Sequence, residues 1–186
     1  MPYPKDRKYT AEEFFALIPE SNSEMYELYN GEIVALASPS ILHQKISMEI
    51  SSEIRNYIKS NKGDCEVFAA PFDVKLDDDT VVIPDISVIC DPSKLSDGKR
   101  CNGAPDFIIE IVSSNRSNDF VRKLELYQKY GVREYWIVDP ESKRVVVYYF
   151  KENNNIKIYT FDQNIPVGIY QKNEIKPEIN IAELIA

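Results

Sequence analysis

Apolar positions alternate with a period of two through several segments of the chain, which predicts half-buried β-strands. Two such runs flank Asn30-Gly31, a dipeptide that favours the positive φ angles of a type I′ turn, so we expect a hairpin there. Further strands, the first of them kinked at Pro71, are predicted over residues 65–76, 81–89, 105–112, 134–139, 144–150 and 156–161.

In three other segments the apolar positions recur at helical spacing. Thr10 and Glu13 form a capping-box pattern, which predicts a short helix over residues 11–18. Longer amphipathic helices are predicted over residues 43–59 and 120–130.

Strands that are separated by helices indicate an α/β protein with a central sheet. At 186 residues the chain is long enough for one well-packed core. We therefore expect a single domain over residues 1–186, in which helices flank one central mixed β-sheet. The tail, residues 176–186, is expected to pack back on this body.

Two of the predicted strands carry a carboxylate inside an apolar run. Pro84 and Asp85 interrupt residues 81–89, and Glu110 interrupts residues 105–112. Proline cannot donate a hydrogen bond to a sheet, and a buried carboxylate without a partner is costly, so neither interruption favours folding by itself. Because strand side chains alternate between faces, the two acids would lie close together if the two strands were neighbours.

Two neighbouring anions repel, and the repulsion raises one of their pKa values unless a cation bridges them. A hard divalent ion satisfies such a pair, and Mg²⁺ needs only one or two carboxylates besides water and substrate phosphate. A metal site at Asp85 and Glu110 is therefore one interpretation. The other is that each acid is simply solvated, or paired with an arginine, near a strand end.

The predicted helix after Glu110 offers a cation to this pair. Asp119, Lys123 and Tyr127 are spaced four apart, so they lie along one edge of that helix. Lys123 flanks the apolar side, and its long side chain could extend to the strand ends, balance the carboxylates and orient a water. The alternative is a surface ion pair between Asp119 and Lys123, which contributes about 0.3 kcal/mol.

Composition narrows the classes of function. The net charge of -8 argues against a general nucleic-acid binder, although a local basic face is compatible with it. No apolar run approaches the roughly 20 residues of a membrane span, and the first ten residues lack the apolar stretch of a secretory signal. Cys65, Cys90 and Cys101 form no CxxC pair and His43 is the sole histidine, which argues against structural zinc and favours a cytoplasmic protein.

Three stretches together resemble the Uma family of restriction endonucleases, small bacterial proteins of the PD-(D/E)XK nuclease superfamily. They are YELYNGEIVALASPSILHQKI, VVIPDISVI and PDFIIEIVSSNRSNDFVRKLELYQKYGVREYWIVDP, and the likeness runs from about Tyr26 to Phe150. Its most specific parts are the Pro-Asp pair, the Glu-Ile-Val-Ser string, the Asp119/Lys123/Tyr127 helix and the GVREYWIVDP ending.

The resemblance implies a restriction-endonuclease-like fold and an endonuclease that hydrolyses phosphodiester bonds of nucleic acid, with DNA as the expected partner. It also implies a Mg²⁺ or Mn²⁺ cofactor and a homodimer or higher homo-oligomer. By position, Asp85 and Glu110 match the metal-binding acids of the two motifs, and the backbone carbonyl of Ile111 would complete the site. Glu27 matches an acid before the first hairpin turn and would be an auxiliary ligand; its alternative is an exposed hairpin residue.

One position departs from the superfamily pattern, which has a lysine two residues after the glutamate. Here that position is Val112, which cannot stabilise charge. The resemblance suggests that Lys123 on the helix replaces it, so that Lys123 would be catalytic together with Asp85, Glu110 and Glu27. If Lys123 does not reach the metal, the alternative is a catalytically inactive nuclease fold that binds nucleic acid or protein.

Contacts to nucleic acid are expected from side chains near the predicted site. Arg116 and Arg122 could bind phosphate, although each could equally be a solvated surface residue. His43 could contact a phosphate, but a lone histidine at a helix start is more often a capping or packing residue. The aromatic side chains of residues 148–150 could stack on bases or form a contact between subunits. In the latter case the protein would be a structural, oligomeric partner, which is the third possible function.

Overall fold

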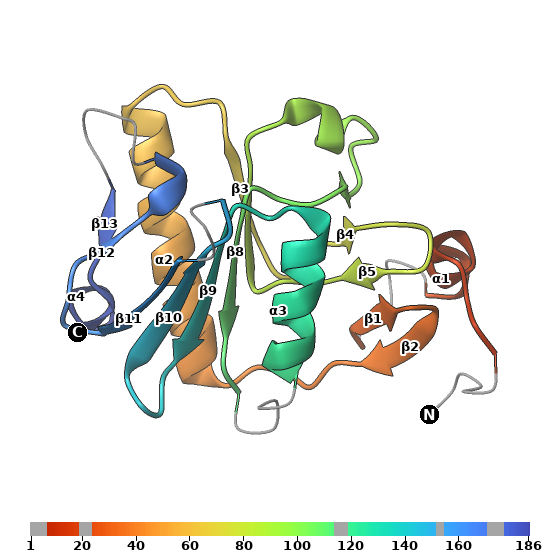
Figure 1. Cartoon of the computed structure of the whole chain (residues 1–186), viewed down its shortest axis with the longest axis horizontal. Coiled ribbons are helices and arrows are strands. Elements are labelled where there is room, and N and C mark those ends of the chain that lie inside the picture. Colours follow the sequence, from red (N-terminus) through yellow and green to blue (C-terminus); the bar gives the residue numbers. More distant parts are fainter. Residues whose placement is uncertain (1–6, 19–23, 114–118, 152–154, 171–176) are drawn as a thin grey trace.

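The computed structural model describes residues 7–18, 24–113, 119–151, 155–170 and 177–186, with the backbone alone for residues 119 and 120 (Figure 1). Its helices are α1 (Ala11–Leu17), α2 (Ile41–Ser60), α3 (Asp119–Tyr130) and α4 (Ile181–Leu184), with 3₁₀ turns η1 (Pro92–Leu95) and η2 (Gly168–Tyr170). Its strands are β1 (Tyr26–Tyr29), β2 (Glu32–Ala35), β3 (Glu66–Ala69), β4 (Val74–Lys75), β5 (Val81–Val82), β6 (Ile86–Ile89), β7 (Cys101–Asn102), β8 (Phe107–Ile111), β9 (Glu134–Asp139), β10 (Arg144–Tyr149), β11 (Asn155–Thr160), β12 (Ile165–Pro166) and β13 (Glu178–Ile179).

A six-stranded mixed sheet in the order β11-β10-β9-β8-β6-β3 forms the body of the molecule. Strands β8 and β9 are parallel, and the other neighbours are antiparallel. Helix α2 lies on one face of this sheet and α3 on the other (Figure 1). The prediction of a central mixed sheet flanked by helices is confirmed, and coverage on both faces explains why β6 and β8 are almost continuously apolar.

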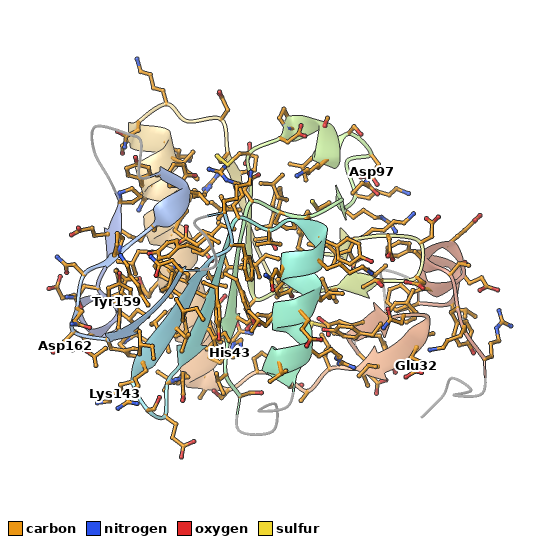
Figure 2. All side chains as sticks on the ribbon, viewed as in Figure 1. Glu32, His43, Asp97, Lys143, Tyr159 and Asp162 are labelled. Carbon is orange, nitrogen blue, oxygen red and sulfur yellow. A yellow bond between two sulfur atoms is a disulfide. The ribbon has the colours of Figure 1, made fainter. Side chains whose placement is uncertain are left out.

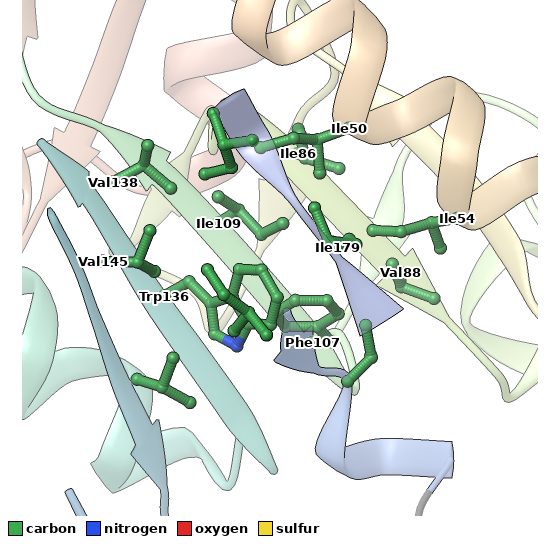
Figure 3. Close-up of a cluster of buried hydrophobic side chains, with 14 of the residues drawn as sticks. Ile50, Ile54, Ile86, Val88, Phe107, Ile109, Trp136, Val138, Val145 and Ile179 are labelled. Carbon is green, nitrogen blue, oxygen red and sulfur yellow. The ribbon is translucent and has the colours of Figure 1, made fainter. Parts of the chain in front are cut away.

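The main core lies between α2 and the sheet, as Figure 3 shows. The isoleucines that recur every four residues along α2 form its helical side. The tail joins the same core through Ile179 and Ile181, as expected. The labelled side chains that meet there are Ile50 and Ile54 of α2 and Ile86, Val88, Phe107, Ile109, Trp136, Val138, Val145 and Ile179 of the strands.

A second sheet of five short strands, in the order β2-β1-β5-β4-β7, was not predicted. It begins with the expected hairpin, in which Asn30 and Gly31 both have positive φ angles, 45° and 80°. Strand β5 then pairs with β1 by the register Leu28↔Val81. The sequence interpretation placed all strands in one sheet, and the second sheet corrects it.

Two segments that were predicted as single strands pass from one sheet to the other at a proline. Residues 65–76 divide into β3 and β4 around a cis Ala70–Pro71 bond, and residues 81–89 divide into β5 and β6. Pro84 lies in the second division, where a missing backbone N–H leaves no ladder position unsatisfied. The proline in the apolar run therefore marks the point at which the chain changes sheets.

Antiparallel pairing of β3 with β6 brings Cys65 and Cys90 together. The register Glu66↔Ile89 makes the two cysteines cross-strand neighbours, and they form a disulfide with a Cα–Cα distance of 4.0 Å. Cys101 is free and buried. The sequence analysis did not anticipate this pairing, because cysteine spacing carries no information about strand register.

Within the described ranges, no helix combines the length and the apolar character needed to cross a bilayer.

Candidate active site

Asp85 and Glu110 lie on neighbouring strands of the six-stranded sheet. The antiparallel register pairs Ile86 of β6 with Ile109 of β8. One step further along both strands, Asp85 therefore comes opposite Glu110. The prediction that the two strands adjoin is confirmed, and both acids are buried.

The Asp85 carboxylate occupies the junction between the two sheets. Its Oδ2 accepts a hydrogen bond of 2.7 Å from the amide of Ile111 and lies 3.1 Å from Nε2 of His43. Its backbone carbonyl accepts from the amide of Ala70 at 3.0 Å and from the hydroxyl of Ser47 at 3.4 Å. The acid at the end of β6 is thus held by β8, by α2 and by the turn that follows β3.

Glu110 is bound by two side chains of α3. Its Oε1 lies 2.8 Å from the Nζ of Lys123 and accepts a hydrogen bond of 2.7 Å from the hydroxyl of Tyr127. The Lys123 side chain is 1% exposed, so the interpretation of this lysine as half of a surface pair is wrong. Its ammonium group supplies charge beside Glu110 that Val112 cannot.

Glu27 brings the second sheet into the same cluster. Its Oε1 accepts a hydrogen bond of 2.9 Å from the amide of Ile83 and lies 3.3 Å from the Nζ of Lys123. All four residues of β1 are buried, because this strand has neighbours on both faces. Glu27 is therefore no exposed hairpin residue, and Lys123 bridges it to Glu110.

The cluster holds more negative than positive charge. Glu27, Asp85 and Glu110 are buried carboxylates, and Lys123 is the buried ammonium among them. The pKa of Glu110 is raised to about 7, mainly by burial and also by the charges of Asp85 and Glu27, against the opposing effect of Lys123. Burial also raises the pKa of Tyr127, which keeps its hydroxyl protonated as a donor to Glu110.

The carboxylates are compatible with a hard divalent ion. In the described ranges the hydrogen bonds to the Asp85 and Glu110 side chains fall on Oδ2 and Oε1, which leaves Oδ1 and Oε2 for a ligand. The same ranges hold no group of three or more His, Cys, Asp or Glu side chains arranged around one metal position. Two carboxylates with water and substrate oxygens suit Mg²⁺, so this donor set fits that ion better than zinc.

The residues expected to contact nucleic acid have different environments. His43 is buried beside Asp85 at the start of α2, and Figure 2 shows it well inside the outline of the molecule. Arg122 is exposed, and its guanidinium lies 3.8 Å from the centre of the Tyr29 ring. Arg116 lies outside the described residues. Whether His43 and Arg122 bind phosphate stays a prediction.

Two contacts of this site were missed at the sequence level. Tyr127 was noted only as part of a helix edge, although its position four residues after Lys123 was the signal that both could reach Glu110. The amide of Ile83, which holds Glu27, could not be found from sequence, because backbone donors become available only where a strand ends.

Comparison with known proteins shows the family of the chain. The sequence profile of the Uma2 family, described as "Putative restriction endonuclease", matches residues 11–173. The chain belongs to this family. It is also 25% identical over 145 residues to the uncharacterized protein slr1290 of Synechocystis, covering 76% of this chain and 75% of that one.

The fold also matches a solved structure from this group of proteins. The crystal structure of "a putative nuclease belonging to DUF820" from Anabaena variabilis superimposes with a TM-score of 0.74 and 26% identity. The match covers 95% of this chain and 97% of that one. The fold of this Uma2 protein is therefore restriction-endonuclease-like, as the sequence resemblance implied.

Proposed function

We propose that this Uma2 protein is a metal-dependent endonuclease that hydrolyses phosphodiester bonds of DNA. The observation that carries the proposal is the buried cluster in which Glu27, Asp85 and Glu110 share the single ammonium of Lys123. Burying three carboxylates with one ammonium leaves an excess of negative charge, which is costly in a folded protein. A divalent cation would offset that excess, and a nuclease of this family has a use for one.

Asp85, Glu110 and the backbone carbonyl of Ile111 would hold Mg²⁺ or Mn²⁺. The free Oδ1 and Oε2 atoms are the carboxylate oxygens that remain for this purpose. The bound ion supplies Lewis acidity toward the scissile phosphate and lowers the pKa of a coordinated water. His43 and the amide of Ile111 fix the Asp85 carboxylate through Oδ2, so its other oxygen keeps one direction.

The remaining residues orient a water and balance charge. Lys123 would direct the attacking water and offset the negative charge that develops on the phosphorane-like transition state. Glu27 holds the ammonium from the side of the second sheet, and Tyr127 holds Glu110 from the next turn of α3. With Val112 two residues after Glu110, Lys123 would take the part that the superfamily gives to a lysine at that position.

The expected assembly is a homodimer or higher homo-oligomer acting on DNA. The Cys65–Cys90 disulfide removes the cysteine argument for a reducing cytoplasm, because such bonds are rare there. Two copies of one site would suit cleavage of both strands of a duplex, which is an argument by analogy with the fold. The acidic cluster would repel DNA until a cation binds, so binding of metal and of DNA should be cooperative.

A catalytically inactive nuclease fold is the second candidate. Val112 in the lysine position and the net charge of -8 favour it. Such a protein would bind nucleic acid or another protein without metal, and Asp85→Ala would leave this binding unchanged. The first candidate instead requires that Asp85→Ala abolish the metal-dependent part of the binding.

The deciding experiment is cleavage of supercoiled plasmid DNA in Mg²⁺ or Mn²⁺. The parent is compared with Glu110→Gln, with Lys123→Met and with Lys129→Met, a control for an exposed lysine of the same helix. We expect the first two variants to lose about 100-fold or more in rate, while the control keeps the parent rate. Equal nicking by all four proteins would identify a contaminant and refute the proposal.

A further inference from the structure

A pocket of about 100 Å³ opens directly beside the Asp85 carboxylate. Met25, Leu36 and Ile83 contribute apolar walls, and His43 and Gln44 contribute polar groups from the first turn of α2. Strand β6 ends at this pocket, so whatever enters it lies next to the buried acids. Neither the metal nor the water of the proposed reaction requires a pocket with apolar walls.

The polar side chains of this pocket have hydrogen-bonding capacity that the described residues do not use. His43 is 7% exposed, and its Nδ1 has no hydrogen-bond partner within the described ranges, although Nε2 faces Asp85. Gln44 is exposed, and its side-chain amide makes no hydrogen bond to the described residues. A buried ring nitrogen without a partner costs free energy, which a donor or acceptor on a ligand would recover.

Two further hollows share lining residues with this pocket. Met25, Pro71 and Ile83 also line the second hollow, of about 270 Å³, which contains the rings of Phe15 and Phe72. Ala37 and Ser113 also line the third, of about 330 Å³, beside the start of α2. A chain-like ligand that occupied both hollows would therefore also run past the residues that line this pocket.

The charges along this path do not suit a rigid duplex. Lys99 and Arg100 line the second hollow together with two carboxylates, and two more carboxylates line the third. Duplex binding depends mainly on cations that neutralise phosphates, and these hollows offer no cationic excess. Unpaired strands also need cations along their backbone, but contacts of their bases with apolar and aromatic walls add affinity that a stacked duplex cannot gain.

From these observations we propose that the pocket beside Asp85 receives one unstacked nucleobase, so the substrate carries an unpaired or extruded nucleotide next to the scissile phosphate. The proposal rests on the proposed nuclease function and specifies its substrate. The base would lie between the apolar walls, while the Gln44 amide and Nδ1 of His43 bind its polar edge. A stacked, paired base cannot reach this position, so unpaired strands and duplexes with a bubble should be preferred over a perfect duplex.

The binding test uses an oligonucleotide with a single 2-aminopurine, whose fluorescence rises when it leaves the base stack. Binding is measured in Ca²⁺, so that it is observed separately from cleavage. We expect the parent to bind the unpaired strand at least about tenfold more tightly than the matched duplex, a difference of about 1.4 kcal/mol. We also expect the 2-aminopurine signal to rise on binding.

Two alanines of the β2 region provide a matched pair of variants. Ala37 lines the pocket, whereas Ala35, two residues earlier, is exposed and lines none of the three hollows. Ala37→Leu should fill the pocket, abolish the fluorescence rise and weaken binding of the unpaired strand about tenfold. Ala35→Leu should behave as the parent. Gln44→Leu, which keeps the volume but removes the amide, should reduce the preference among the four bases.

The outcomes separate this inference from the proposed function. Equal affinity for paired and unpaired strands, or equal behaviour of Ala37→Leu and Ala35→Leu, would overturn the pocket even if the protein cleaves DNA in Mg²⁺. A fluorescence rise that Ala37→Leu abolishes would support the base pocket. If the same protein shows no cleavage, only the catalytic proposal is refuted. If neither the paired nor the unpaired strand binds, the proposal of a base pocket is overturned as well.

Discussion

The Nζ of Lys123 lies 2.8 Å from the Oε1 of Glu110, so an ammonium group carried by α3 is fully buried against a carboxylate in the middle of β8. The same Nζ is 3.3 Å from Glu27, which belongs to the other sheet. One cation thus joins α3, β8 and β1. Glu27 and Glu110 are both buried, so solvent cannot take the place of the ammonium group if it is removed. This arrangement determines how the site responds to substitution.

Replacement of Lys123 should destabilise the protein strongly. Lys123→Met keeps most of the side-chain volume but leaves Glu27 and Glu110 buried without their cation, and removal of one partner from a buried ion pair typically costs about 3–5 kcal/mol. The free energy of unfolding from urea titrations, without divalent metal, measures the effect. Lys129→Met, at an exposed position of the same helix, should change it by less than about 0.5 kcal/mol. Similar values for both variants would contradict the burial of this ion pair.

Divalent metal should stabilise the parent in proportion to its binding. At a concentration of 100 times its dissociation constant, a ligand that binds only the folded state adds about 2.7 kcal/mol to the free energy of unfolding. We expect Mg²⁺ or Mn²⁺ to raise the melting temperature of the parent, and Asp85→Asn to abolish the rise. Asp162→Asn, an exposed residue at the margin of the molecule in Figure 2, should keep it. A rise that survives Asp85→Asn would place the metal elsewhere.

Tyr127 should contribute through its hydroxyl group alone. Tyr127→Phe removes the hydrogen bond of 2.7 Å to Glu110 and leaves the ring in place, and a hydrogen bond to a charged group contributes about 1.5–3 kcal/mol. Urea titration should therefore show a loss of this size. Tyr159→Phe, on the partly exposed outer part of β11, is the control and should be nearly neutral. Equal effects would mean that the hydroxyl of Tyr127 does not support Glu110.

The sequence predicted elements better than their assembly into sheets. The hairpin at Asn30-Gly31 and strand β9 lie where local signals put them, because turn chemistry and alternation act within a few residues. The second sheet was missed, because its strands β4, β5 and β7 are two residues long and show no alternation of their own. The breaks at Pro71 and Pro84 were the only local trace of the change between sheets.

The site was predictable to the extent that it depends on interrupted apolar runs. Asp85 and Glu110 stood out because a carboxylate is costly inside a buried strand, and helix spacing indicated Lys123. The family resemblance supported Lys123 and added Glu27. The contacts among these four residues could not be predicted, because they depend on how α3 is placed over two sheets. The contact of His43 with Asp85 likewise joins α2 to β6 and has no counterpart in sequence spacing.

The Cys65–Cys90 disulfide should stabilise strand β6, which begins directly after Asp85. It closes a loop of 25 residues between β3 and β6, for which chain entropy predicts about 3 kcal/mol. The double variant Cys65→Ser/Cys90→Ser should lose about this amount in urea titrations. Reductant should destabilise the parent but leave the double variant unchanged. Denatured, unreduced parent should contain one reactive thiol, from Cys101, and three thiols would refute the bond.

A further buried carboxylate, Glu134, predicts how stability depends on pH away from the metal site. Its oxygens accept hydrogen bonds from Nε1 of Trp136 at 2.7 Å and from the amide of Ile169 at 2.8 Å. Burial nevertheless raises its pKa to about 7, against the opposing effects of the amides of Gly168 and Ile169, of Trp136 and of the charge of Arg133. The folded state therefore binds more protons than the unfolded state between about pH 4.5 and 7.

Because the folded state binds the extra proton, the contribution of Glu134 to stability is greatest below about pH 4.5 and is lost as the pH rises to about 7. A pKa difference of about 2.5 corresponds to about 3 kcal/mol. Glu134→Gln does not titrate, so the parent should lose about 2.5 kcal/mol relative to the variant between pH 5 and pH 8. Urea titrations at several pH values measure the free energy of unfolding of the parent and of Glu134→Gln. The substitution also alters hydrogen bonds, but this effect is the same at every pH and does not contribute to the change with pH. A difference that does not change with pH would show that the hydrogen-bond donors keep Glu134 ionised despite its burial.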